Sequence, residues 1–177
     1  LAGSLNFSDL NEWAQTAQLS PLTSTLLGIA LIAAPAGKCA QFPLHLWLDE
    51  AMEGPNPASV LRNSMVVSGG AYVLYKLQPI LALSPVALTA LVILGTVTAI
   101  GASLVSIAQI DIKRALSHST SAYMGLVFLA VGLQQGGVAL MLLFTHAIAK
   151  ALLFMSAGSV IATTHTQDLT EMGGLWS

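Results

Sequence analysis

Long runs of apolar residues alternate with short polar segments along the chain. A helix needs about 20 apolar residues to cross the hydrocarbon core of a bilayer. We expect five spans, near residues 22–48, 58–81, 87–107, 115–133 and 138–162. Residues 1–21 are mildly amphipathic and are expected to lie in the membrane interface, with Trp13 at headgroup depth. The pattern predicts an all-α, polytopic transmembrane helix bundle.

The polar connections between these spans are expected to alternate between the two faces of the membrane. This places residues 49–57, 109–114 and 163–174 on one face. Lys113 and Arg114, which follow Asp111, assign that face to the cytoplasm by the positive-inside rule. Because the chain starts at Leu1 and stops abruptly, we expect residues 1–177 to be an internal piece of one larger membrane domain.

The composition supports a membrane protein, because 55% of the residues are hydrophobic and only 8% are charged. The formal net charge of −2 and the scattered basic residues argue against binding of nucleic acid. The single cysteine, Cys39, cannot form an internal disulfide. No phosphate-binding loop, nucleophile elbow or paired-histidine metal motif is found in the sequence.

Lys38 is the first of three ionisable residues that fall inside apolar spans. A lysine at the centre of a span costs roughly 2.5–3.5 kcal/mol, so it usually faces a bundle interior or a wet cavity. Pro35, Gly37 and Pro43 weaken helical hydrogen bonding around Lys38 and predict a discontinuous helix there. Non-helical backbone at this depth must line water or be buried in protein. The alternative is that Lys38 snorkels to an interface.

His146 and Lys150 are the other two, and their four-residue spacing puts them on one face of a helix. A neutral imidazole can accept and pass on a proton, and its ordinary pKa near 6.5 suits that task. The pattern therefore favours a proton-transfer pair. The alternative is a packed histidine with a hydroxyl partner and a lysine near the end of the span.

Further polar side chains begin the second and fourth spans. Arg62 and Asn63 either anchor the second span at the headgroups or form a polar entrance near the buried lysines. His118, Ser119 and Thr120 belong to a hydroxyl-rich cluster that starts the fourth span. Hydroxyls in membrane helices often satisfy neighbouring helices, so a structural role is the alternative to proton transfer.

Three long stretches are distinctive, "GKCAQFPLHLWLDEAMEGPNPAS", "DIKRALSHST" and "THAIAKALLFMSAGSVI". All three closely resemble one family, the antiporter-like proton-channel subunits of respiratory complex I. The "AMEGP" form resembles the large F/L-type branch of that family. The stretch "LRNSMVVSGGAYVLYKLQP" resembles the variant found in cyanobacterial NDH-1 complexes for carbon dioxide uptake.

The resemblance implies a many-helix bundle with a polar axis near the bilayer midplane. It makes Lys38 a proton-carrying site on a broken helix and places His146 and Lys150 on the connecting path. Two departures are visible, since Asn63 replaces a usual histidine and Leu142 stands where many relatives have another. The family's acidic partner and its terminal lysine lie outside residues 1–177.

The resemblance further implies a proton-translocating subunit of a ferredoxin-linked plastoquinone oxidoreductase in a cyanobacterial thylakoid membrane. Its partners would be other NDH-1 membrane subunits, including a neighbouring antiporter-like one, and the lipid bilayer. A zinc-bearing protein that hydrates carbon dioxide would join in the uptake form. Plastoquinone and iron–sulfur clusters would lie elsewhere in the complex, with no cofactor or metal in this chain. The alternatives are an ordinary respiratory or cyclic-electron-flow subunit, a cation/proton antiporter subunit without a redox arm, and a structural membrane scaffold.

Overall fold

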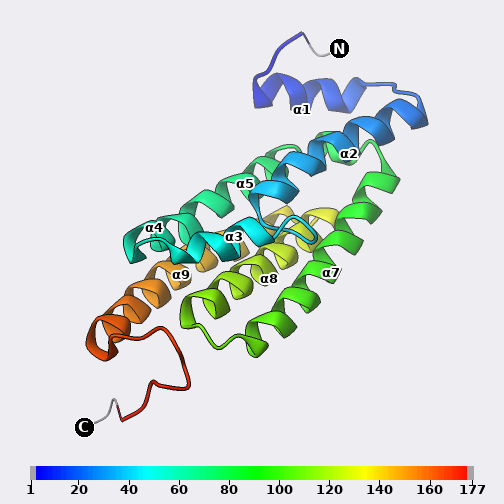
Figure 1. Ribbon diagram of the computed structural model, residues 1–177. Helices are drawn as coiled ribbons and strands as arrows, with labels where there is room; N and C mark the ends of the chain where they lie inside the picture. Colours follow the sequence, from blue (N-terminus) through cyan, green and yellow to red (C-terminus); the bar gives the residue numbers. More distant parts are fainter. Residues whose placement is uncertain (1–2, 175–177) are drawn as a thin grey trace.

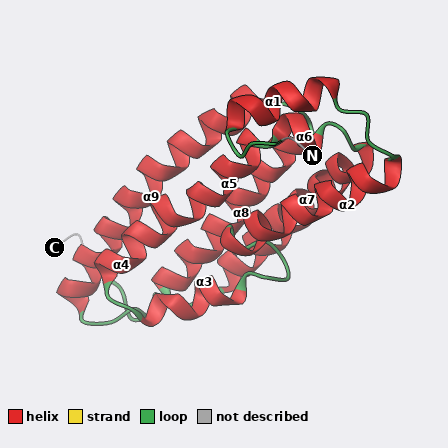
Figure 2. Cartoon of the chain, turned by 90° about the horizontal axis from the view of Figure 1, so that it is seen from above, coloured by secondary structure: helices red, strands yellow, loops and turns green. Residues whose placement is uncertain are grey.

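The computed structural model describes residues 3–174, and these fold into helices joined by short connections (Figures 1 and 2). The fold class predicted from the sequence is confirmed. The elements are α1 (Phe7–Thr16), α2 (Pro21–Lys38), α3 (Leu46–Glu50), a 3-10 turn (Ala51–Glu53), α4 (Asn56–Leu61), a π-helical segment (Arg62–Val66), α5 (Val67–Lys76), α6 (Gln78–Leu81), α7 (Pro85–Ala108), α8 (Ile112–Gly132) and α9 (Gly136–Thr164).

The first two predicted spans are not continuous α-helices. In the run predicted at 22–48, the helix α2 ends at Lys38, and helical structure resumes only in α3. The run at 58–81 is divided among α4, the π segment, α5 and α6. By length and composition, α7 and α9 are the two helices within residues 3–174 that could cross a membrane. The five membrane spans as such stay a prediction.

Two of the long helices begin at well-formed caps. Ser20 precedes α2, and its hydroxyl accepts a hydrogen bond from Thr23 N at 3.2 Å. Ser84 does the same for α7, accepting from Ala87 N at 3.3 Å. Each cap is followed by a proline in the first turn, where a missing N–H costs nothing. These serine–proline pairs explain where α2 and α7 start.

Helix α8 forms the centre of the packing, with contacts to α3, α5, α7 and α9 (Figure 1). Its fully buried Met124, Val127 and Phe128 contribute to the hydrophobic core. Its contact with α7 is close enough to require glycine on both helices. A Cβ on Gly125 would lie 2.7 Å from Ala99 N and from Gly95 O, so the two backbones meet almost directly.

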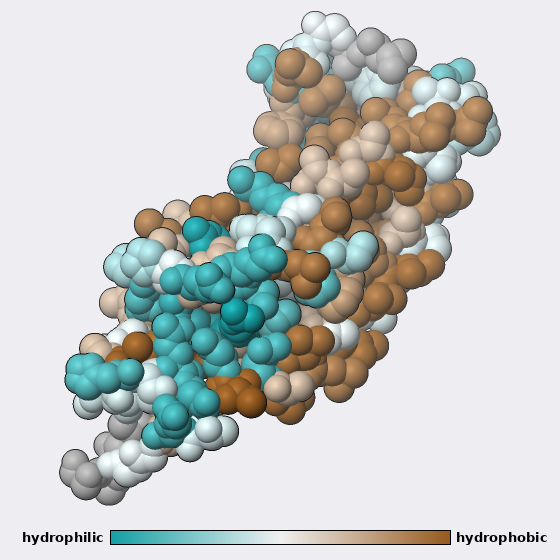
Figure 3. Space-filling view, in the orientation of Figure 1, coloured by the Kyte–Doolittle hydropathy of each residue, from teal (hydrophilic) through white to brown (hydrophobic). Residues whose placement is uncertain are grey.

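The outer faces of α7 and α9 are apolar and exposed within the described residues. On α7 they carry Ile93, Val97, Ile100, Leu104 and Ile107, and on α9 Met141, Phe144, Ile148 and Leu152. Figure 3 shows a broad hydrophobic surface on the side of α7 and hydrophilic residues gathered at the lower left, over α3 and α4. Such surfaces are typical of helices that face lipid or further apolar helices.

The three connections predicted to share one face of the membrane do meet at one end of the bundle. Residues 109–112 pair with residues 167–169, through Ile112 N to Gln167 O at 3.0 Å and Leu169 N to Ile110 O at 2.9 Å. Arg114 contacts Asp49 at 3.3 Å and Glu53 at 3.5 Å. We call this end of the bundle, with Asp49, Glu53 and Arg114, the charged end. Which side of the membrane it faces stays a prediction.

We expect Gly125→Ala to destabilise the α7–α8 contact by about 1–3 kcal/mol, because its methyl group overlaps backbone atoms that cannot move independently. The matched control is Gly69→Ala in α5, where an added Cβ meets nothing within 4 Å. Thermal unfolding of the assembled complex, with the amount of full-length chain in the membrane, measures both. Equal behaviour of the two variants would contradict the proposed close contact.

Candidate functional site

The predicted break in the first long helix is present and is held in a defined conformation. Helix α2 ends at Lys38, and Cys39 N and Gln41 N still bond to Pro35 O at 2.8 Å and Ala36 O at 2.9 Å. Ala40 then takes a positive φ of 51°, and the Phe42–Pro43 peptide is cis. Pro35, Gly37 and Pro43 thus lie at the break, as the sequence predicted.

Neighbouring helices hold the loop of residues 39–45. The buried Gln41 donates from Nε2 to Cys39 O at 3.0 Å and to Ser121 O of α8 at 3.4 Å. Phe42 N donates to the Thr98 hydroxyl of α7 at 3.1 Å. Freed backbone groups therefore have protein partners, which a broken helix inside a membrane requires.

Lys38 itself is exposed within the described residues, and its Nζ makes no hydrogen bond or ion pair to residues 3–174. Its stem packs on α5, where a Cβ added to Gly70 would lie 3.0 Å from Lys38 Cβ. Trp47 Nε1 bonds to Gly37 O at 2.9 Å just before it. The structure thus places Lys38 at the break but does not join it to His146 or Lys150. Its proton-carrying role stays a prediction.

His146 and Lys150 lie on the buried stripe of α9, with 1% and 4% of their surfaces exposed. Lys150 Nζ donates to Leu116 O at 2.9 Å and to Ser119 Oγ at 2.7 Å, both on α8. The predicted shared face is therefore correct. The alternative of a lysine near the end of the span does not fit, because Lys150 lies in the middle of α9 and its ammonium group is bonded to α8.

The ring of His146 has an unambiguous hydrogen-bonding direction on one side. Its Nε2 lies 3.1 Å from Asn63 O. A carbonyl oxygen can only accept, so Nε2 carries the hydrogen, and in the neutral ring Nδ1 is the basic nitrogen. Nδ1 is buried and has no hydrogen-bond partner within residues 3–174. The ring also packs on Tyr123, with centroids 4.9 Å apart. The predicted hydroxyl partner of a merely packed histidine is not the partner seen here.

Asn63 contacts His146 through its backbone carbonyl rather than through its side chain. It lies in the π segment, whose wider helical turn changes the usual pairing of carbonyls, and such segments are frequent at functional sites. Its side-chain amide donates to Ser59 O at 3.0 Å. Arg62, beside it, donates to Ala51 O at 2.7 Å and fixes the preceding turn. Neither contact is the headgroup anchor considered from the sequence.

The remaining predicted residues lie in two places. One is the group of Ser119, Tyr123, His146 and Lys150 on α8 and α9, which we call the relay after its predicted role. The other is the charged end. Thr120 donates to Leu116 O at 3.1 Å, so this carbonyl accepts from both Thr120 and Lys150. His118 lies in another contact, 3.3 Å from Asp49 Oδ1. Lys113 is buried and donates to Gly54 O at 2.7 Å. The Lys113 ammonium group is therefore bonded inside the protein, and it is weak support for the positive-inside assignment.

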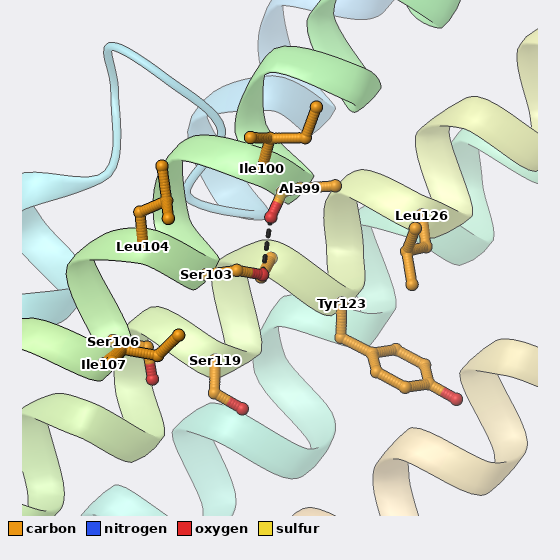
Figure 4. A pocket seen from close by; sticks show the side chains of 10 residues that line it. Ala99, Ile100, Ser103, Leu104, Ser106, Ile107, Ser119, Tyr123 and Leu126 are labelled. Carbon is orange, nitrogen blue, oxygen red and sulfur yellow. Dashed lines mark hydrogen bonds between the residues drawn. The ribbon is translucent and has the colours of Figure 1, made fainter.

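A groove of about 660 Å³ lies between α7 and α8 and reaches the relay from outside (Figure 4). Its polar lining consists of Ser103, Ser106, Ser119 and Tyr123. Ser119 is also the partner of Lys150, and Tyr123 OH lies 2.9 Å from the Thr145 hydroxyl. The hydroxyl groups of Ser119 and Tyr123 in the relay therefore line a groove that is open to the outside of the bundle. Within residues 3–174, no group of three or more His, Cys, Asp or Glu side chains could hold a metal ion.

The chain was compared with known protein families and with curated proteins. The family model described as "NADH:quinone oxidoreductase/Mrp antiporter, TM" matches residues 1–177. The chain belongs to this family. The resemblance to antiporter-like subunits of complex I is thereby confirmed, whereas the resemblance to the carbon dioxide uptake variant stays a prediction.

Relatives within the family come from several lineages. The chain is 64% identical over 176 residues to NAD(P)H-quinone oxidoreductase subunit 5, organellar chromatophore 2, of Paulinella chromatophora, covering 99% of this chain and 28% of that protein. It is 43% identical over 178 residues to NADH-ubiquinone oxidoreductase chain 5 of Patiria pectinifera, covering 97% and 28%. It is 38% identical over 189 residues to the chloroplastic subunit 5 of Lolium perenne, covering 99% and 26%. The chain thus spans little more than a quarter of these relatives.

Four residues of this family member were not singled out from the sequence. His45, Asp49 and Gln41 follow Lys38 in the same stretch, and Tyr123 lies one helical turn after Ser119. His45 had a detectable signal, since it is a histidine within the same apolar run as Lys38. The role of Gln41 had none, because its partners come from α8.

Asp111, in the polar connection that precedes α8, caps that helix by accepting from Lys113 N at 2.8 Å and Arg114 N at 3.0 Å. We expect Asp111→Ala to lower the stability of the assembled complex by about 0.5–2 kcal/mol, because those N–H groups lose their acceptor. Asp111→Asn retains a capping oxygen and should retain most of the stability. Thermal unfolding distinguishes the two variants. Equal loss in both would show that the negative charge, rather than the cap, is what matters.

Proposed function

We propose that the chain is part of a proton-translocating membrane subunit of an NDH-1-type quinone oxidoreductase. In the whole protein, redox energy released elsewhere in the complex changes the protonation of Lys38. Protons then pass between Lys38 and Lys150 through His146, bound water and nearby hydroxyls. Family membership and the names of the relatives, which are quinone oxidoreductase subunits, support this proposal.

The observation that carries it is the burial of His146 and Lys150 on one face of α9, inside the bundle. Nε2 of His146 is committed to Asn63 O, which leaves Nδ1 as a proton acceptor one helical turn from the Lys150 ammonium. Lys150 can give up a proton and keep its position, because Leu116 O and Ser119 Oγ remain beside Nζ. Ser119 can donate as well as accept, so it stays bonded to a neutral amine. This arrangement suits a group that gains and loses a proton repeatedly.

The chemistry required is proton transfer, without bond-making at carbon or electron transfer by this chain. We therefore expect no redox cofactor or metal in it. Plastoquinone and the iron–sulfur clusters belong to other parts of the proposed complex. The partners would be further membrane subunits, including a neighbouring antiporter-like subunit, in a thylakoid-type membrane.

Lys150→Met is expected to lower proton translocation per electron roughly tenfold or more, because the relay loses its ionisable end. Lys38→Ala should have the same effect. The control is Lys76→Met, since the ammonium group of Lys76 lies over the Tyr72 and Tyr75 rings, 5.6 and 5.9 Å from their centroids, away from the relay. Proton uptake by vesicles containing the assembled complex is measured together with quinone reduction.

The same measurement decides between the rival functions. A structural scaffold predicts normal coupling in Lys150→Met and Lys38→Ala, with assembly intact. A cation/proton antiporter subunit predicts that the chain purifies without quinone-reductase subunits. Normal pumping per electron in Lys38→Ala would overturn the role assigned to that lysine.

A finer proposal is that this is the form coupled to carbon dioxide hydration and uptake. It is supported by the stretch that contains Arg62 and Asn63, where the chain departs from the common pattern. Arg62, Asn63 and His118 are then the candidates for a modified proton exit or gas path. A zinc-bearing partner on the cytoplasmic side would hydrate carbon dioxide and release a proton. The membrane subunit would remove that proton, and this removal would draw hydration forward.

We expect Arg62→Ala and His118→Ala to lower bicarbonate production by the assembled complex, because these side chains would serve the modified exit. Accumulation of labelled inorganic carbon, with plastoquinone reduction followed in parallel, measures the effect. Unchanged bicarbonate production in both variants would count against the uptake form and would leave the general proton-translocating role untouched.

A further inference from the structure

Two histidines and a carboxylate meet between the loop of residues 39–45 and the charged end, apart from His146 and Lys150. His118 Nε2 of α8 lies 3.3 Å from Asp49 Oδ1 of α3. The ring of His45, from the loop, lies with its centroid 6.1 Å from that of His118 and stacks on Phe42 at 3.9 Å. Three separate segments therefore converge on one small titratable cluster.

The charged groups around this cluster form a chain that reaches the surface. Asp49 Oδ2 accepts from Arg114 at 3.3 Å, and Arg114 also contacts Glu53 at 3.5 Å. The Glu53 side chain is 80% exposed, the Arg114 side chain 38% and the Asp49 side chain 18%, while that of His118 is 6% exposed. Exposure thus falls stepwise from the charged end to the buried imidazole.

Hydrogen bonding in the cluster is incomplete within residues 3–174. Asp49 Oδ1 and His45 Nδ1 are both buried without a hydrogen-bond partner there, although Asp49 Oδ1 is in ion-pair contact with His118. Buried polar atoms of this kind normally bind ordered water or each other. A carboxylate oxygen and an imidazole nitrogen that lack a hydrogen-bond donor are atoms that can accept a proton.

We propose that Asp49, His118 and His45 form a second proton-transfer branch between the charged end and the broken helix. A proton accepted by one ring nitrogen of His118 is matched by release from the other, so the ring returns to neutrality with its tautomer exchanged. His45 passes the proton on within the loop that begins directly after Lys38. This branch rests on the proposed proton-translocating function.

Its position explains how the branch stays separate from the first relay. His118 and Ser119 are neighbours on α8, but Ser119 bonds to Lys150 of α9 whereas His118 faces Asp49 of α3. Successive residues of a helix point about 100° apart, so one turn of α8 serves both paths. The branch connects α8 with α3 and the loop of residues 39–45, whereas the relay connects α8 with α9.

The decisive variant is His118→Gln, which can still donate to Asp49 but cannot take up and release a proton. Protons pumped per electron should fall at least twofold in vesicles, with assembly and uncoupled quinone reduction retained. Asp49→Asn should give the same loss, and the double variant should lose no more than either alone, because both act on one path. His165→Gln is the matched control, since His165 is exposed after the end of α9.

Other outcomes overturn the branch. A normal ratio in His118→Gln and Asp49→Asn, while Lys150→Met still abolishes pumping, would refute it and leave the proposed function standing. Normal pumping in all three variants would refute both. If His118→Gln, Asp49→Asn and His45→Gln all prevent assembly, the cluster is a structural contact and the branch is wrong.

Discussion

A backbone N–H or C=O at membrane depth must find a partner in the protein or in a water-filled cavity, and the end of α2 at Lys38 releases such groups from the helix. The loop meets this requirement by three means, with bonds back to α2, the side chain of Gln41 and the hydroxyl of Thr98. The same contacts fix where His45 and Asp49 stand. The polar groups proposed to move protons thus depend on a loop whose first requirement is hydrogen bonding.

Helix α8 brings the loop of residues 39–45 together with the other polar groups of the candidate site. Its glycine contact with α7 brings the backbones together, and its other sides meet α9, α5 and α3. Within one turn it supplies Leu116 O and Ser119 to Lys150, and His118 to Asp49. A buried ammonium group needs such ready acceptors, because removal from water is costly unless hydrogen bonds replace hydration. The close packing therefore supports the chemistry.

Much of the fold could be predicted from the sequence, because apolar length and proline positions act locally. The break after Lys38 and the shared face of His146 and Lys150 are examples. What could not be predicted depends on contacts between distant segments. Lys113 helped to assign the cytoplasmic face, but its ammonium group donates to Gly54 O of a distant segment, and Asn63 contacts His146 through its carbonyl, which no side-chain pattern reveals. The exposure of Lys38 also follows from packing alone.

The π segment has a further consequence for the helices on either side of it. An inserted residue advances the phase of a helix by about 100°, since an α-helix has 3.6 residues per turn. Helix α4 can therefore direct one side toward α9, where Asn56 bonds to Phe154 O, while α5 turns Gly70 toward the stem of Lys38. One stretch of chain thereby faces two partners in different directions. The five residues from Arg62 to Val66 thus set the rotation between α4, which contacts α9, and α5, which contacts the end of α2.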